Sequence, residues 1–98
     1  MAETLRVVAH LKAKAGKEEE LKNLLCGLIA PTRKETGYLE YRLYQNQADA
    51  QDLTFVEEWE NDAALDAHLA SPHLAEALAR IPELLEGNAD IRRYQLIA

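Results

Sequence analysis

A carboxylate lies between two aromatic residues in the segment Phe55-Val56-Glu57-Glu58-Trp59. Because side chains in a strand alternate between two faces, Phe55, Glu57 and Trp59 are predicted to share one face. A carboxylate among aromatic rings loses hydration, which raises its pKa and suits it to accept a proton. The flat indole of Trp59 suits either a core or an aromatic ligand. An ion-paired or helix-capping residue at the sheet edge is the alternative role for Glu57.

Two histidines follow this segment. His73 is predicted just inside the start of a helix, where the helix dipole favours neutral imidazole and therefore a base. His68 lies between Leu65 and Leu69 on the apolar side of a short helix, which also suits a hydrogen-bonded core residue. Glu57, His68 and His73 are the candidate catalytic residues of an acid/base pocket.

The spacing of these residues does not favour a metal or nucleotide site. The two histidines are five positions apart, whereas a zinc pair on one helix requires four, and no third ligand has a suitable spacing. The single cysteine, Cys26, provides no disulfide partner and is predicted to be buried and inert. The chain contains no phosphate-binding glycine motif, which disfavours nicotinamide and nucleotide cofactors. From the ligand spacing and this missing motif we predict no metal and no cofactor.

The composition is that of one small acidic domain. The 98 residues are 48% hydrophobic, and 17 acidic against 11 basic residues give a net charge of −6. This predicts a single packed domain over residues 1–98 and argues against nucleic-acid binding, which uses a basic face. No apolar run is long enough to span a membrane and no signal peptide is visible, so we expect a cytoplasmic protein without membrane contact.

Hydrophobic periodicity predicts the elements that position the candidate residues. The predicted strands are residues 4–13, 38–46, 53–60 and 91–97, and the predicted helices are 17–35, 62–70 and 72–80. Pro31 should kink or restart the first helix because it removes a backbone donor. Asn61 and Ser71 are predicted to cap the later helices. A surface loop is expected over residues 45–52, and a loose turn between Pro82 and Gly87.

The order β-α-β-β-α-α-β predicts an α+β fold of the ferredoxin-like, split βαβ type. Its four-stranded antiparallel sheet would carry helices on one face only. Within the second strand, Leu39 and Tyr41 are predicted to face one side and Tyr38 the other. Since Val8, Val56 and several tyrosines lie on the uncovered face, a homodimer that packs sheet against sheet is expected.

Several motifs extend over nearly the whole chain and together indicate a family. They are Lys14-Ala15-Gly16-Lys17-Glu18, Arg33-Lys34-Glu35-Thr36-Gly37-Tyr38, Glu57-Glu58-Trp59, Ala64-Leu65, His68 and Ser71-Pro72-His73. In these motifs the sequence resembles the antibiotic biosynthesis monooxygenase family, in its quinol-monooxygenase-like branch. The resemblance implies a dimeric α+β barrel that oxidises quinols or anthrone-like phenols with O₂ and without metal, flavin or heme.

The resemblance also suggests roles for individual residues. Glu57, His68 or His73 would take a proton from a small aromatic substrate, whose ring would lie against Trp59, Tyr41 and Phe55. Heme-degrading relatives have an asparagine and a heme-ligating histidine where this chain has Ala9 and Leu78, so heme degradation is not expected. An isomerase or tautomerase that uses the same carboxylate and histidines, or a ligand-binding dimer without turnover, remains an alternative.

Overall fold

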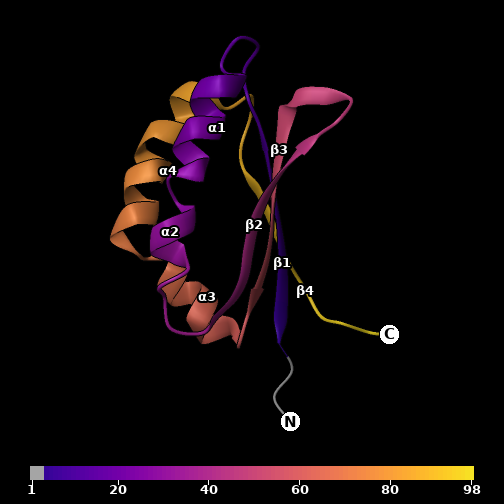
Figure 1. The fold of residues 1–98 in the computed structure, drawn as a ribbon, viewed down its shortest axis with the longest axis vertical. Coiled ribbons are helices and arrows are strands. Elements are labelled where there is room, and N and C mark those ends of the chain that lie inside the picture. Colours follow the sequence, from indigo (N-terminus) through magenta and orange to yellow (C-terminus); the bar gives the residue numbers. More distant parts are fainter. Residues whose placement is uncertain (1–3) are drawn as a thin grey trace.

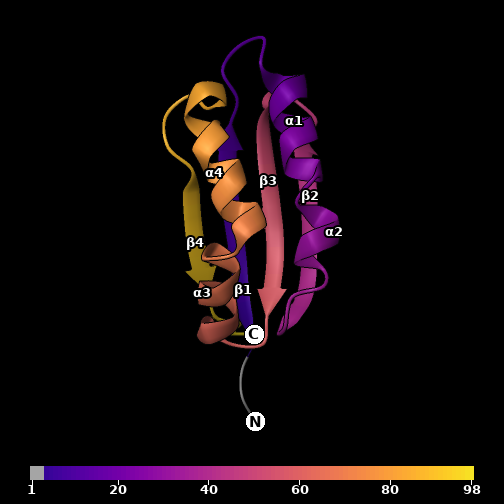
Figure 2. The same cartoon turned by 90° about the vertical axis from the view of Figure 1, so that its left-hand side faces the viewer.

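The structure is a computed structural model that describes residues 4–98, so Met1–Glu3 of the predicted domain lie outside it. The elements are β1 (Leu5–Lys12), α1 (Glu18–Cys26), α2 (Ile29–Thr32), β2 (Tyr38–Asn46), β3 (Asp49–Trp59), α3 (Asp62–Leu69), α4 (Pro72–Leu84) and β4 (Asp90–Tyr94). The strands form one antiparallel sheet in the order β2-β3-β1-β4, and the helices all cover the same face (Figures 1 and 2). The predicted α+β, ferredoxin-like fold is confirmed.

The two central strands direct their apolar side chains toward the helices. In β3 the exposed fractions of Phe55, Glu57 and Trp59 are 3%, 4% and 0%, which confirms that the three residues share a buried face. Strand β1 pairs with β3 so that Val7 lies opposite Glu57. Glu57 is therefore enclosed by the sheet and by the helices that cover it.

A β-bulge at the start of β2 interrupts the alternation of side chains between the two faces of the sheet. The register shifts between Tyr38 and Glu40, and Leu39 is 43% exposed. The bulge places Tyr38 opposite Trp59, with the two rings edge to face and their centroids 6.4 Å apart. Tyr38 therefore packs against the core on the side of Tyr41 while Leu39 does not, so the prediction that Leu39 shares a face with Tyr41 and that Tyr38 faces the other side was wrong.

A tight turn replaces the loop that was predicted over residues 45–52. Strand β3 begins at Asp49, so only residues 47 and 48 separate it from β2. The Asn46 side chain accepts a hydrogen bond from the Ala48 amide at 2.8 Å and donates one to Asp52 at 3.0 Å. These local hydrogen bonds satisfy polar groups of the turn, so that the pairing of β2 with β3 continues through this polar segment.

The predicted helix over residues 17–35 is divided in two. Helix α1 ends at Cys26, and the four-residue α2 contains Pro31. A proline ring clashes with the carbonyl group four positions earlier, which here belongs to Gly27, and the helix breaks at that point. Cys26 is exposed because it lies one position, or about 100° of helix rotation, beyond the buried Leu25. The prediction of a buried Cys26 was wrong.

The C-terminal predictions also require correction. Pro82 lies inside α4, which continues to Leu84 because Ile81 and Leu84 are buried against the core. Strand β4 ends at Tyr94 and does not extend to residue 97. Beyond it the chain leaves the sheet on the side away from the helices (Figure 1).

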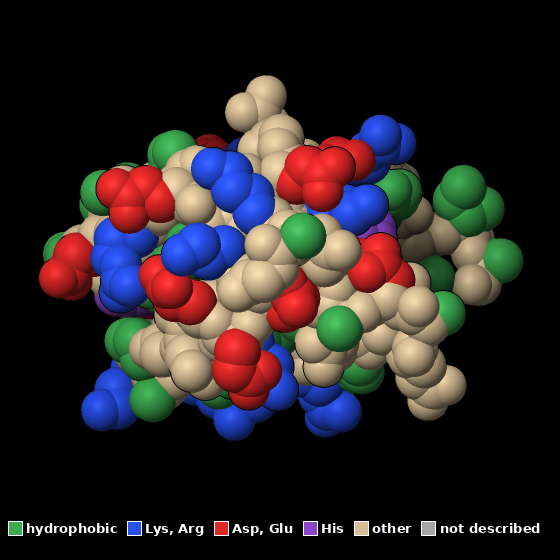
Figure 3. Space-filling model, turned by 90° about the horizontal axis from the view of Figure 1, so that it is seen from above, with side chains coloured by type: hydrophobic (Ala, Val, Ile, Leu, Met, Phe, Trp, Pro, Cys, Tyr) green, Lys and Arg blue, Asp and Glu red, His purple; other side chains and the backbone are tan. Residues whose placement is uncertain are grey.

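Within residues 4–98, no helix combines the length and the apolar character needed to cross a bilayer. On the end of the molecule shown in Figure 3, acidic and basic side chains are intermixed.

Candidate active site

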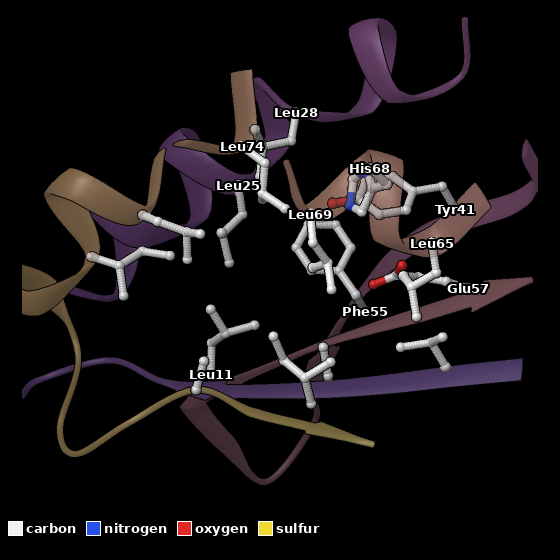
Figure 4. A pocket seen from close by; sticks show the side chains of 16 residues that line it. Leu11, Leu25, Leu28, Tyr41, Phe55, Glu57, Leu65, His68, Leu69 and Leu74 are labelled. Atoms are coloured by element: carbon white, nitrogen blue, oxygen red, sulfur yellow. The ribbon is translucent and has the colours of Figure 1, made fainter. Parts of the chain in front are cut away.

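A cavity of about 50 Å³ lies between the sheet and the helices. Its wall is apolar except for three side chains, those of Tyr41, Glu57 and His68, and Figure 4 shows these three toward one end of the pocket, with leucines around the rest. Leu78 and Ile91 also line the cavity and are 42% and 45% exposed. The cavity therefore reaches the surface between α4 and β4.

Glu57 is held within this wall by its neighbour on β3. Its Oε1 accepts a hydrogen bond from Nε1 of Trp59 at 2.9 Å. Burial raises the pKa of Glu57 to about 7, a rise that the Trp59 hydrogen bond opposes and the charge of Glu35 reinforces. The predicted increase in this pKa is confirmed, and near neutral pH the carboxyl group can either accept or donate a proton.

His68 lies on α3, whose start is fixed as predicted by Asn61, because the Asn61 side chain accepts a hydrogen bond from the Ala64 amide at 2.9 Å. The imidazole is 2% exposed and packs against the rings of Trp59 and Tyr41, at centroid distances of 4.7 and 5.3 Å. Burial lowers the pKa of His68, although the neighbouring Glu35 acts in the opposite direction. A neutral imidazole therefore faces the cavity at neutral pH.

His73 lies on the other side of the same network. Ser71 caps α4 as predicted, accepting a hydrogen bond from the Leu74 amide at 3.4 Å. The Nε2 atom of His73 lies 2.8 Å from Oε2 of Glu35 and 3.2 Å from the Ser71 hydroxyl. His73 lines a separate hollow together with Glu76 and other residues of α1 and α4, and it does not line the cavity.

The predicted aromatic residues occupy two different positions. Tyr41 and Phe55 line the cavity and stack, with ring centroids 4.6 Å apart. Trp59 does not line it and instead supports Glu57 and His68 from behind. Burial, with a further contribution from the charge of Glu57, raises the pKa of Tyr41, so its phenol remains protonated and can donate a hydrogen bond.

Glu35 is the residue that the sequence reasoning did not identify as part of the site. It lies between α2 and β2, and its Oε2 contacts Nδ1 of His68 and Nε2 of His73, each at 2.8 Å. Only its place in the motif from Arg33 to Tyr38 could have indicated it. The contact is long-range, since 33 positions separate Glu35 from His68.

Glu35, His68 and His73 each offer one potential ligand atom, all within 4.8 Å of one another. Sequence spacing offered no third ligand, whereas the fold brings Glu35 beside the two histidines. A metal ion would need lone pairs directed at a common point, about 2.0–2.2 Å from each donor. Here both histidine nitrogens lie 2.8 Å from one carboxylate oxygen, which is the geometry of two N–H donors on one acceptor. We therefore interpret the cluster as a hydrogen-bonded network.

The raised pKa of Glu57 predicts a pH-dependent stability. Its ordinary value of 4.5 applies to the unfolded chain, and the folded value is about 7. Between these values the folded protein retains a proton on Glu57 that the unfolded chain has lost. The contribution of this proton to the free energy of unfolding is therefore complete below pH 4.5 and is lost as the pH rises through 7. It amounts to at most roughly 3 kcal/mol.

Urea unfolding at several pH values between 4.5 and 8 measures this effect in the wild type and in Glu57→Gln, which keeps an acceptor for Trp59 but does not titrate. The difference in free energy of unfolding between the two proteins at each pH separates the effect of Glu57 from that of His68. The lowered pKa of His68 makes stability rise with pH, which is the opposite trend. Equal pH dependence in both proteins would contradict the expectation.

Comparison with known proteins identifies a family and several relatives of this chain. Residues 4–80 match the sequence profile of the family described as "Antibiotic biosynthesis monooxygenase". The chain is 35% identical to the "Putative monooxygenase Rv0793" of Mycobacterium tuberculosis, over 87% of this chain and 83% of that protein. It is also 34% identical to the "Uncharacterized protein sll1783" of Synechocystis, over 92% of this chain, but spans only 61% of that relative.

A solved structure shares the whole fold. The crystal structure of PA3566 from Pseudomonas aeruginosa superposes with a TM-score of 0.91 at 34% identity, covering 100% of this chain and 98% of that one. The similarity therefore extends over the sheet and all the helices that cover it.

Proposed function

This chain belongs to the antibiotic biosynthesis monooxygenase family, and we propose that it oxidises an electron-rich phenol, such as a quinol or an anthrol, with O₂. The observation that carries the proposal is the apolar cavity whose polar side chains are a neutral histidine, a carboxyl group with a pKa of about 7 and a protonated phenol. These groups can move a proton and orient a hydroxyl group, and the apolar wall keeps water away.

His68 acts as the base. The lone pair of its neutral imidazole takes the proton of the substrate hydroxyl, and the resulting phenolate is far more easily oxidised than the phenol. Phe55 and Tyr41 form the wall beside the substrate ring, and the Tyr41 hydroxyl and the protonated form of Glu57 donate hydrogen bonds to its oxygen atoms.

The remaining steps require only the substrate and O₂. The phenolate gives one electron to O₂, and the substrate radical and superoxide combine to form a C–O bond. The peroxide anion takes the proton from His68. Loss of water then breaks the O–O bond and the C–H bond at the same carbon, leaving one oxygen atom in a new carbonyl group and the other in water.

The cavity must widen to admit a bicyclic substrate, since about 50 Å³ holds only roughly three or four water molecules. The side chains at its mouth, Leu78 and Ile91, are half exposed and are the ones free to move. We expect Leu78→Trp to close the mouth and raise KM about tenfold with little change in kcat. Glu83→Trp, on the same helix but away from the lining, is the matched control. An unchanged KM for Leu78→Trp would show that substrate enters elsewhere.

The proposal is tested by O₂ consumption with a panel of reduced naphthoquinones and anthrols. The wild type should accelerate O₂ uptake with at least one of them above the rate without protein. No acceleration with any member would contradict it. Deuterium exchange into a carbonyl compound, without O₂ uptake, would instead favour the isomerase or tautomerase alternative, and binding without either would favour a non-catalytic ligand-binding dimer.

We also propose that the helix-free face of the sheet pairs with a second copy. Tyr44 and Tyr94 on this face are 50% and 46% exposed, and Leu96 and Ile97 in the C-terminal segment beyond it are 79% and 96% exposed. Covering such apolar groups favours association. Analytical ultracentrifugation at micromolar concentration should give twice the chain mass of 11.0 kDa, and Tyr44→Glu combined with Tyr94→Glu should give the monomer. A monomeric wild type would contradict the dimer.

A further inference from the structure

Glu35 accepts hydrogen bonds from one histidine that faces the cavity and from one that faces the outside. We propose that Glu35 is the positioning residue of this site, which holds His68 in the tautomer with the Nε2 lone pair toward the cavity and stabilises the imidazolium formed when His68 takes a proton. The catalytic part of this inference rests on the proposed function, whereas the tautomer is a property of the resting protein.

The hydrogen bond between His68 and Glu35 determines the tautomer. A carboxylate oxygen only accepts, so Nδ1 of His68, 2.8 Å from Oε2, must carry the proton. Within residues 4–98 the side-chain hydrogen bond of His68 is made by Nδ1 and none is made by Nε2, and the ring lines the cavity. A neutral His68 therefore has its lone pair on Nε2. In water the opposite tautomer, with the proton on Nε2, is the more common one for histidine.

His73 donates a second hydrogen bond to Glu35. The Ser71 hydroxyl donates its proton to the carbonyl oxygen of His68 at 2.7 Å, so it can only accept from Nε2 of His73, 3.2 Å away. Nε2 of His73 therefore carries a proton and donates to Glu35 as well. Oε2 of Glu35 therefore accepts hydrogen bonds from both histidines, which fixes the orientation of its carboxylate group. His73 is thus a second positioning residue, because it touches Glu35 and not the cavity.

The surroundings of Glu35 agree with this role. Its backbone is fixed on both sides, since the Glu35 amide donates to Thr32 at 3.0 Å and the Tyr38 amide donates to the Glu35 carbonyl at 3.3 Å. The charge of Glu35 reaches the sheet, where it contributes to raising the pKa values of Tyr41 and Glu57. Its side chain is 16% exposed, so the pair is shielded from solvent but not sealed. This combination of a shielded carboxylate and an imidazole is the arrangement that orients a base and stabilises its protonated form.

The first test needs no substrate. Long-range ¹H–¹⁵N correlation spectra of the histidine rings, recorded above neutral pH, report which nitrogen carries the proton. We expect His68 of the wild type to carry it on Nδ1, and Glu35→Gln to shift the population toward Nε2. Glu76→Gln, which removes a carboxylate from α4 in the outer hollow, is the matched control and should leave His68 unchanged. A wild-type His68 protonated on Nε2, or a tautomer unaffected by Glu35→Gln, would overturn the proposal.

The second test uses the quinol that gives the highest O₂ uptake. Glu35→Gln should lower kcat about 100-fold with little change in KM, and should move the acid limb of the pH profile of kcat. Glu35→Asp should recover part of this loss. His73→Gln should lower kcat about tenfold. Equal rates in Glu35→Gln and the wild type would contradict the positioning role. If the wild type oxidises no quinol, the proposed function fails, and the ring spectra still decide the role of Glu35.

Discussion

Replacing His68 by glutamine is expected to lower kcat/KM for quinol oxidation by roughly 10²–10⁴-fold, the contribution that a positioned general base usually makes. His68 is the one histidine that lines the cavity, and burial keeps it neutral by lowering its pKa. Glutamine preserves much of the volume and can still bond to Glu35, but it has no lone pair that takes a proton near neutral pH. The loss should therefore appear in kcat more than in KM.

The control for this substitution is His10→Gln. His10 lies on β1 with its side chain 53% exposed and bonded to Thr54, and it does not line the cavity. This variant should retain the wild-type rate. Steady-state O₂ uptake with the same quinol measures both variants, and circular dichroism shows whether each is folded. A folded His68→Gln protein with wild-type kcat/KM would show that another group, with Glu57 the next candidate, takes the proton.

Replacing Gly37 by alanine is expected to destabilise the fold by about 2–4 kcal/mol, for two additive reasons. Gly37 has a φ of +84°, in the left-handed region that disfavours any side chain. An added Cβ would also lie 2.5 Å from Cβ of Ala64 on α3, which is closer than two carbon atoms can approach. Because Gly37 lies two residues after Glu35, and Ala64 lies on the helix of His68, the substitution would push apart the elements that bring these two residues together.

Gly16→Ala separates the cost of the positive φ from the cost of the steric clash. Gly16 has almost the same φ, +85°, but nothing lies within 4 Å of the position that an added Cβ would take, so alanine there should cost only about 1–2 kcal/mol. Urea unfolding of the two variants and the wild type gives the comparison through the transition midpoint. If both substitutions cost the same free energy, the close packing of the turn against α3 makes no contribution to stability.

The sequence was sufficient to predict those parts of the site that depend on local patterns. Alternation along one strand placed Phe55, Glu57 and Trp59 on a common face, and the capping residues Asn61 and Ser71 located the starts of both later helices. Each of these features depends on residues within a few positions of one another. The shared face also explains why the raised pKa of Glu57 could be predicted, since its neighbours on the strand are aromatic.

The features that the sequence did not predict depend on contacts between distant segments. Glu35 joins the two histidines only because the turn before β2 packs against the ends of α3 and α4, and no local periodicity records that contact. The bulge at Leu39 pairs Tyr38 with Trp59 on the neighbouring strand, and this turns Tyr38 to the face opposite to the one predicted. The separation of His73 from the cavity likewise follows from helix packing, which places it on an outer hollow.

The proposed reaction inserts one oxygen atom of O₂ into a phenolic substrate bound beside His68. The most direct test is a reaction of the purified protein with an anthrol under ¹⁸O₂, followed by mass spectrometry of the product. We expect one ¹⁸O atom in the new carbonyl group, at a rate that falls in His68→Gln in parallel with O₂ uptake. A product without ¹⁸O, or the same labelling rate in His68→Gln and in the wild type, would contradict the claim.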